Sequence, residues 1–225
     1  MTFQVCTDLY ANPLLAPRLA VDRGKRWLPG QTLQIGFLGG SNFQKLKVMD
    51  IASEWLHWAN LYFFWHTSEA NTNGKLDVRV SFDRGKGSWS YVGIDSLAIA
   101  NQRQATMNFG WLDESTADDE WSRTVLHEFG HMLGAIHEHQ SPAASIKWDL
   151  PLLYQYYWDT QGWSKEQVDS NIVRKYNKGV TNTEFDRESI MLYPVEQRFT
   201  LDDFAVGWNR QLSDQDKGFM EEMYP

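Results

Sequence analysis

The sequence has 225 residues, enough for one large domain or for two subdomains that share a cleft. Hydrophobic residues make up 42% of the chain and aromatic residues 14%, which excludes a disordered protein, and no apolar segment is long enough to cross a bilayer. The formal net charge of -8 argues against nucleic acid as a partner, because phosphate binding requires a basic surface.

Residues 1–30 contain three prolines and little periodicity, and we interpret them as an extended arm that precedes the catalytic domain. They include Cys6, the single cysteine of the chain, so an intramolecular disulfide is impossible. The first residues lack a basic segment followed by an apolar one and do not resemble a secretory signal peptide. This observation leaves the place of action open.

The segment after the arm predicts a sheet with a helix packed on it. Residues 32–37 alternate and are rich in β-forming side chains, and Ser41 is a suitable N-cap for a helix that reaches about Asn60. The apolar positions of this helix recur at steps of three and four residues: Leu46, Met49, Ala52, Leu56 and Ala59. Further strands are predicted at 61–65, 77–82, 88–93 and 106–109. This order predicts a mixed sheet covered by helices.

A second long helix is predicted to begin at 116–119 and to end near Gly134. Its acidic residues, Asp118, Asp119 and Glu120, suit the positive end of a helix, and they lack the spacing of a calcium-binding loop. Beyond residue 140 the sequence predicts short helices at 152–158 and 165–176. A final helix is predicted at 214–223, with Ser213 as its N-cap.

The second helix carries a pattern that indicates a metal site. His127 and His131 are four residues apart, so both imidazoles lie on one helical face and can bind one ion. The distance from zinc to a coordinating imidazole nitrogen is about 2.0–2.1 Å. Glu128 lies about 100° further round the helix, where a general base beside the metal is expected.

The third histidine, His137, requires the helix to end. A continuous helix would carry it about 9 Å along the axis from His131 and away from the metal. Gly134 stands where the chain must turn back, and glycine readily adopts the left-handed conformation of a helix end. Three histidine ligands would leave the fourth zinc position open, which is typical of a catalytic site. An amphipathic helix with incidental histidines is the alternative, although three of the six histidines fall in this window.

The pattern at 127–137 resembles the extended zinc signature of the metzincins. Residues 189–193 resemble the methionine-containing turn of that group, with Met191 in place. In the astacin family a tyrosine two residues after this methionine can act as a further zinc ligand, and Tyr193 matches it. Residues 89–93 and 212–216 resemble the substrate-edge strand and the start of the last helix. The resemblance covers about residues 27 to 225.

Two features depart from the astacin pattern. Leu192 replaces the usual histidine of the turn, and the usual disulfides are absent. Glu138 follows the third histidine, as in mature astacins, where this glutamate contacts a freed N-terminus. A local hydrogen-bonding role is the alternative here.

Cys6 gives a further hypothesis, in which a thiolate from the arm caps the zinc. The alternative is that Cys6 packs as a small buried side chain. His139 falls outside the ligand spacing.

The resemblance implies an α+β, metzincin-like fold. A twisted mixed sheet and two long helices would form an upper subdomain at 31–139, and a smaller irregular subdomain would follow at 140–225. It implies a zinc-dependent endopeptidase whose metal ligands are His127, His131, His137 and Tyr193. Its catalytic residues would be Glu128 and Tyr193. We expect a monomer that acts on proteins or peptides, with no nucleic acid or membrane partner. Extracellular action rests on the resemblance alone.

Two other functions remain open from the sequence. One is a zinc hydrolase that cleaves another amide, such as a cell-wall peptide crosslink. The other is a zinc-binding module without catalytic activity. The intact Glu128 disfavours the second, because a site without chemistry has no use for a general base.

Overall fold

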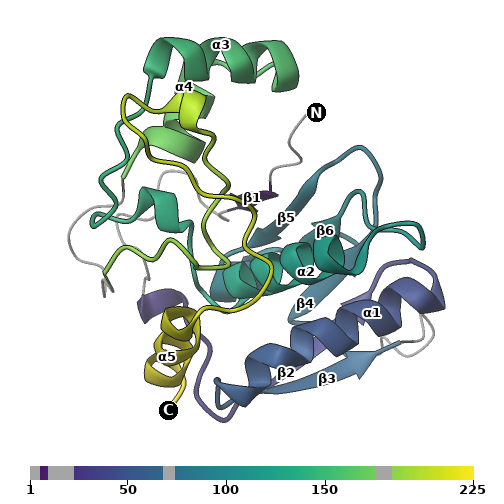
Figure 1. Ribbon diagram of the computed structural model, residues 1–225. Helices are drawn as coiled ribbons and strands as arrows, with labels where there is room; N and C mark the ends of the chain where they lie inside the picture. The colour runs from purple at the N-terminus through teal and green to yellow at the C-terminus, as the bar shows by residue number, and fades with distance from the viewer. Residues whose placement is uncertain (1–5, 10–22, 68–73, 176–183) are drawn as a thin grey trace.

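The computed structural model describes residues 6–9, 23–67, 74–175 and 184–225, and is built around a mixed sheet (Figure 1). Its strand order is β1-β5-β6-β4-β2-β3. Every neighbouring pair is parallel except β5 and β6, which are antiparallel. The strands are β1 (Cys6–Leu9), β2 (Thr32–Phe37), β3 (Tyr62–His66), β4 (Val78–Ser81), β5 (Ser88–Tyr91) and β6 (Met107–Phe109). The expected α+β fold with a mixed sheet is confirmed.

Strand β1 is an addition that the sequence did not predict. It comes from the region interpreted as an arm and pairs in parallel with β5, with Cys6 opposite Ser88 and Leu9 opposite Tyr91. It therefore covers the outer edge of β5, the strand that resembles the substrate edge of astacins. The four residues of β1 show no periodicity, which is why sequence patterning did not reveal the strand.

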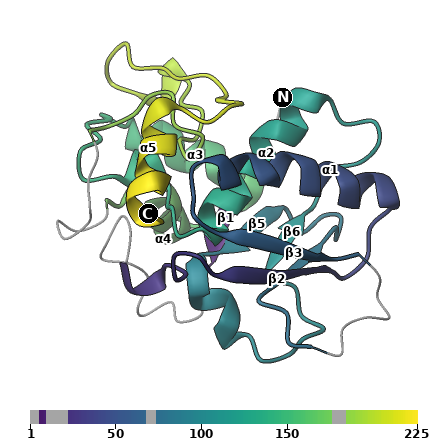
Figure 2. The same ribbon diagram turned by 90° about the horizontal axis from the view of Figure 1, so that it is seen from below.

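Two helices cover the same face of the sheet (Figure 2): α1 (Asn42–Ala52) and α2 (Asp118–Met132). The predicted N-cap Ser41 is confirmed, and it forms a capping box with Gln44. However, α1 ends earlier than predicted and continues as a 3-10 helix at Ser53–His57. The prediction that Leu46 is buried is wrong, since 63% of it is exposed. The buried face contains Val48, and residues two apart on a helix do not share a face.

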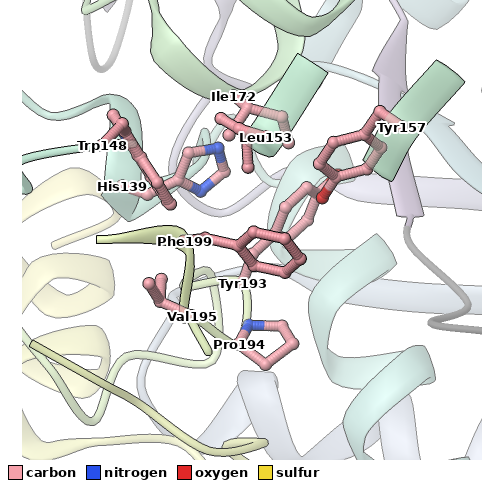
Figure 3. Close-up of a pocket in the computed structure, with 9 residues that line it drawn as sticks. All are labelled: His139, Trp148, Leu153, Tyr157, Ile172, Tyr193, Pro194, Val195 and Phe199. Atoms are coloured by element: carbon pink, nitrogen blue, oxygen red, sulfur yellow. The ribbon is translucent and has the colours of Figure 1, made fainter. Parts of the chain in front are cut away.

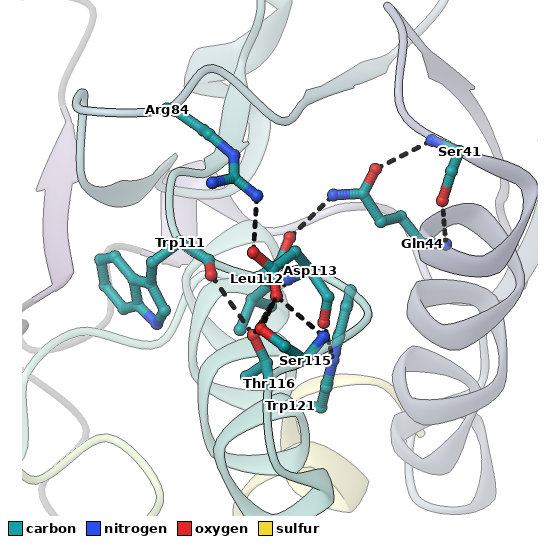
Figure 4. Close-up of polar contacts among 9 residues, drawn as sticks. All are labelled: Ser41, Gln44, Arg84, Trp111, Leu112, Asp113, Ser115, Thr116 and Trp121. Atoms are coloured by element: carbon teal, nitrogen blue, oxygen red, sulfur yellow. Dashed lines mark hydrogen bonds and ion pairs between the residues drawn. The ribbon is translucent and has the colours of Figure 1, made fainter.

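The start of α2 is fixed by the loop that precedes it (Figure 4). The carboxylate of Asp113 accepts hydrogen bonds from the backbone and hydroxyl of Ser115 and forms an ion pair with Arg84. The side-chain amide of Gln44 donates to the carbonyl of Leu112 at 2.7 Å, which joins the loop to the first turn of α1. These contacts set the position from which the histidine-bearing helix begins.

The final helix lies at the lower left of Figure 1 and packs on the core of the sheet, whereas the first two helices after residue 140 belong to a separate layer in the upper part of the picture. The apolar cluster of this layer contains Leu153, Tyr157, Val168, Ile172, Tyr193 and Phe199, and it also takes in Cys6 of β1. The helices are α3 (Leu150–Gln161), α4 (Lys165–Val168), a π-helical turn (Asp169–Val173) and α5 (Asp214–Met223). Ser213 caps α5 as predicted, and the helix predicted at 165–176 is formed as far as Val173 by α4 and the π-helical turn, while residue 176 lies outside the described residues. Within the described ranges, no helix has the length and apolar character needed to span a membrane.

Candidate metal centre

The end of α2 determines how the third histidine approaches the other two. Gly134 has a φ of 100°, which glycine adopts without steric cost. Its N–H donates to the carbonyl of His131, and the N–H of Ala135 donates to the carbonyl of Gly130, which together form a Schellman motif. The helix thus ends where the sequence predicted, and the chain turns back toward His131.

The three histidines lie together in the interior. His127, His131 and His137 are buried, and one ring nitrogen from each lies within 4.8 Å of the others. The Nδ1 of His127 is 2.8 Å from the carbonyl oxygen of Ile190, and the Nδ1 of His131 is 2.9 Å from that of Ala135. Because a carbonyl oxygen only accepts, each Nδ1 carries the proton and each Nε2 offers a lone pair.

These side chains fit a zinc ion. Burial, and next the charge on His131, lowers the pKa of His127 and of His137 well below the usual value. Neutral imidazole is the form that binds metals. The Nε2 atoms of His131 and His137 are only 3.2 Å apart, so a cation that both nitrogens bind suits this arrangement. Three nitrogen ligands and one open position are the usual set for catalytic zinc.

The methionine-containing turn, Ser189–Tyr193, lies against the histidine helix. Its closing hydrogen bond runs from the N–H of Leu192 to the carbonyl of Ser189 at 3.1 Å. A Cβ placed on Gly130 would lie 2.4 Å from the Sδ of Met191, so the glycine of α2 makes room for the methionine. The turn also supplies the carbonyl of Ile190 that orients His127. The sequence motif gave no indication of that contact.

Tyr193 extends the site toward the second layer. Its ring centroid is 4.3 Å from that of His137 and 4.6 Å from that of His139. Figure 3 shows Tyr193 and His139 on the wall of an apolar pocket formed with side chains of α3 and with Phe199. The pocket has a volume of about 20 Å³, room for about one water molecule. The structure therefore brings Tyr193 to the histidines, and it places His139, which falls outside the ligand spacing, beside Tyr193.

Glu128 is fully buried next to His127 and meets the N-terminal strand. The buried thiol of Cys6 interacts electrostatically with the Glu128 carboxylate and with Arg123. Burial, reinforced by the charge of Glu128, raises the pKa of Cys6 well above its usual value. Arg123 is held by Glu120 through hydrogen bonds of 2.8 and 2.5 Å. Cys6 thus lies beside the proposed general base, whereas the hypothesis from the sequence placed its thiolate on the zinc.

Glu138 faces away from the histidines toward the final helix. Its Oε1 accepts a hydrogen bond of 3.0 Å from the N–H of Asp186, and its own N–H donates to the carbonyl of Met191. Burial raises the pKa of Glu138 to about 8. In the described chain this glutamate takes the local hydrogen-bonding role that was the alternative to contact with an N-terminus.

Comparison with protein-family profiles and with curated protein sequences gave no match. Solved structures did match. A structure of myroilysin shares 42% sequence identity, covers 91% of this chain and 98% of its own, and superposes with a TM-score of 0.85. The chain belongs to the astacin-like metzincin family. A second myroilysin crystal structure shares 39% identity over 99% of this chain and 91% of its own, with a TM-score of 0.72.

A more distant match shows the fold alone. It is high choriolytic enzyme 1, a hatching enzyme zinc-protease from the medaka fish Oryzias latipes, with 14% identity over 89% of this chain and 94% of its own. Its TM-score is 0.59. The astacin-like fold is therefore retained although few residues are shared. Family membership and the histidine cluster make this astacin-like chain a zinc metalloendopeptidase.

Proposed function

We propose that His127, His131 and His137 hold the catalytic zinc and that Glu128 is the general base for hydrolysis of peptide bonds. The observation that carries this proposal is the convergence of three buried imidazole nitrogens within 4.8 Å. Glu128 is the neighbouring residue of the same helix and is fully buried. Bound zinc supplies a Lewis acid that lowers the pKa of a water molecule to about 7 and polarises the scissile carbonyl.

The protein groups then move the protons. Glu128 accepts a proton from the attacking water and passes it to the nitrogen of the leaving amine as the C–N bond breaks. The hydroxyl of Tyr193 donates a hydrogen bond to the oxyanion of the tetrahedral intermediate, and it is the candidate fourth protein ligand in the resting site. The tilted ring contact of Tyr193 with His137 supports this assignment because it places the phenol beside the proposed ligands.

Replacing Tyr193 with phenylalanine is expected to lower kcat by about 10²-fold with little change in KM, because the lost hydrogen bond forms mainly in the transition state. The ring and its packing are kept, so the melting temperature should stay close to that of the wild type. Tyr157→Phe, in the same apolar cluster but stacked on Trp163, is the matched control. A raised KM with unchanged kcat would assign Tyr193 to ground-state binding instead.

The proposed substrate is an extended segment of a protein or peptide that adds to β5. Strand β1 supports this placement, because it already pairs with β5 as an added strand would. For the same reason we propose that β1 masks the site in this chain: it covers the edge of β5 and brings Cys6 to Glu128. Release of β1 would free both the edge of β5 and Glu128.

A cleavage assay separates the proposed activity from the other zinc hydrolase reaction. The zinc-loaded full chain is expected to release new amino termini from an unfolded protein and from internal bonds of long peptides. The same preparation is tested on purified cell-wall peptide crosslinks. Cleavage of the crosslinks alone would replace the endopeptidase proposal with the alternative.

A further inference from the structure

A carboxylate of the final helix holds the methionine-containing turn from beneath. One oxygen of Asp216 is 2.7 Å from the hydroxyl of Ser189. The other accepts hydrogen bonds from the N–H of Ile190 at 2.8 Å and from the N–H of Ser213 at 3.0 Å. Asp216 is buried, so each of these bonds forms away from solvent. One side chain thus joins two residues of the turn to the start of α5.

A second line of contacts leads from the same helix to the third histidine. The hydroxyl of Ser213 donates to Asp186 at 2.5 Å, and the N–H of Asp186 donates to Glu138 at 3.0 Å. Glu138 follows His137 directly and donates its own N–H to the carbonyl of Met191. We call the set Asp216, Ser213, Asp186 and Glu138 the carboxylate bracket.

The backbone of Ile190 connects the bracket to the metal site. Its N–H is bound by Asp216, and the carbonyl of the same residue accepts from the Nδ1 of His127. A shift of the turn away from Asp216 therefore moves the carbonyl that fixes the tautomer and ring plane of His127. Loss of an outer partner of a ligating histidine costs about 10–100-fold in metal affinity or activity.

We propose that Asp216 is a positioning residue of the zinc centre, which fixes His127 through Ile190 and supports Glu138, the residue after His137, through the bracket. The inference rests on the proposed assignment of the three histidines as zinc ligands. It goes further in placing control of the site on a helix that contributes no ligand.

Zinc release from the full chain tests the inference. Asp216→Ala removes every acceptor and is expected to speed transfer of zinc to a competing chelator by about 10–100-fold. Asp216→Asn should keep most of the wild-type retention, because its amide oxygen can accept from both N–H groups while its NH₂ donates to Ser189. Asp214→Asn is the matched control, since Asp214 lies on the same helix with a fully exposed side chain.

The absorption spectrum of the cobalt-substituted chain reports ligand geometry directly. It should change in Asp216→Ala and return in Asp216→Asn, which a loss of helix packing alone would not produce. If Asp216→Ala does not fold, zinc release is measured in Ser189→Ala instead, and we expect it to be several-fold faster than in the wild type. A folded Asp216→Ala variant that releases zinc at the wild-type rate and keeps the wild-type cobalt spectrum would overturn the inference. A wild-type chain that binds no zinc at the histidines would instead overturn the proposed function.

Discussion

Replacement of Glu128 with glutamine is expected to reduce kcat by about 10²–10⁴-fold while the chain still binds one zinc ion. Glutamine keeps the size of the side chain but cannot accept the proton of the attacking water, and general base catalysis contributes a factor of this order. The three histidines proposed as ligands are untouched, so metal content should not change. The measurement is kcat on an internally quenched peptide, with zinc content determined on the same samples.

The exposed Glu114 gives a matched control, because Glu114→Gln removes an equal charge from the loop before α2. This variant should cleave the peptide at the wild-type rate. If Glu128→Gln retained wild-type kcat with a full complement of zinc, another group would have to serve as the base. If both variants lost zinc and activity together, the effect would lie in metal binding rather than in proton transfer.

Deletion of residues 1–9 is expected to raise peptide cleavage by about 10- to 1000-fold. The expectation follows from the pairing of β1 with β5, which keeps substrate from that edge except in a minor open state. Minor states of this kind are populated at about 0.1–10%, and activity scales with that fraction. The measurement compares initial rates of the full and shortened chains at equal zinc content. Equal rates would show that β1 does not mask the site.

Two substitutions of Cys6 distinguish between two explanations of how β1 is held in place. Serine can donate a hydrogen bond to a carboxylate but is a poor zinc ligand, whereas alanine can form neither interaction. If hydrogen bonding and strand pairing hold β1, Cys6→Ala should be more active than Cys6→Ser. If a thiolate on zinc holds it, both should be active to the same degree. Unchanged activity in both variants would remove Cys6 from any masking role.

The histidine-bearing helix α2 was predictable because its pattern is local in sequence. His127 and His131 share a helical face, and the break that returns His137 is encoded by Gly134, all within eleven residues. The last helix was equally clear, since Ser213 is a strong local N-cap signal. Such features depend on spacing and backbone preference, which the sequence displays directly.

The contacts that depend on distant pairing were not predictable. The β1 segment pairs with a strand more than eighty residues away, and its four residues carry no pattern that selects this partner. Asp216 was visible only as part of a helix start, although its carboxylate binds the turn at Ile190. Leu46 was assigned to the buried face of its helix and is exposed, although Ala52 and Ala59 of the same series are buried, because periodicity gives the spacing of a buried face but not its extent.

The location of zinc in a crystal of the full chain tests the central claim most directly. Anomalous scattering measured on both sides of the zinc absorption edge should give one strong peak. That peak should lie about 2.0–2.1 Å from the Nε2 atoms of His127, His131 and His137, with Glu128 beside it and not bound to it. A zinc peak at other residues, or no peak there in crystals of protein shown to cleave peptides, would contradict the proposed catalytic centre.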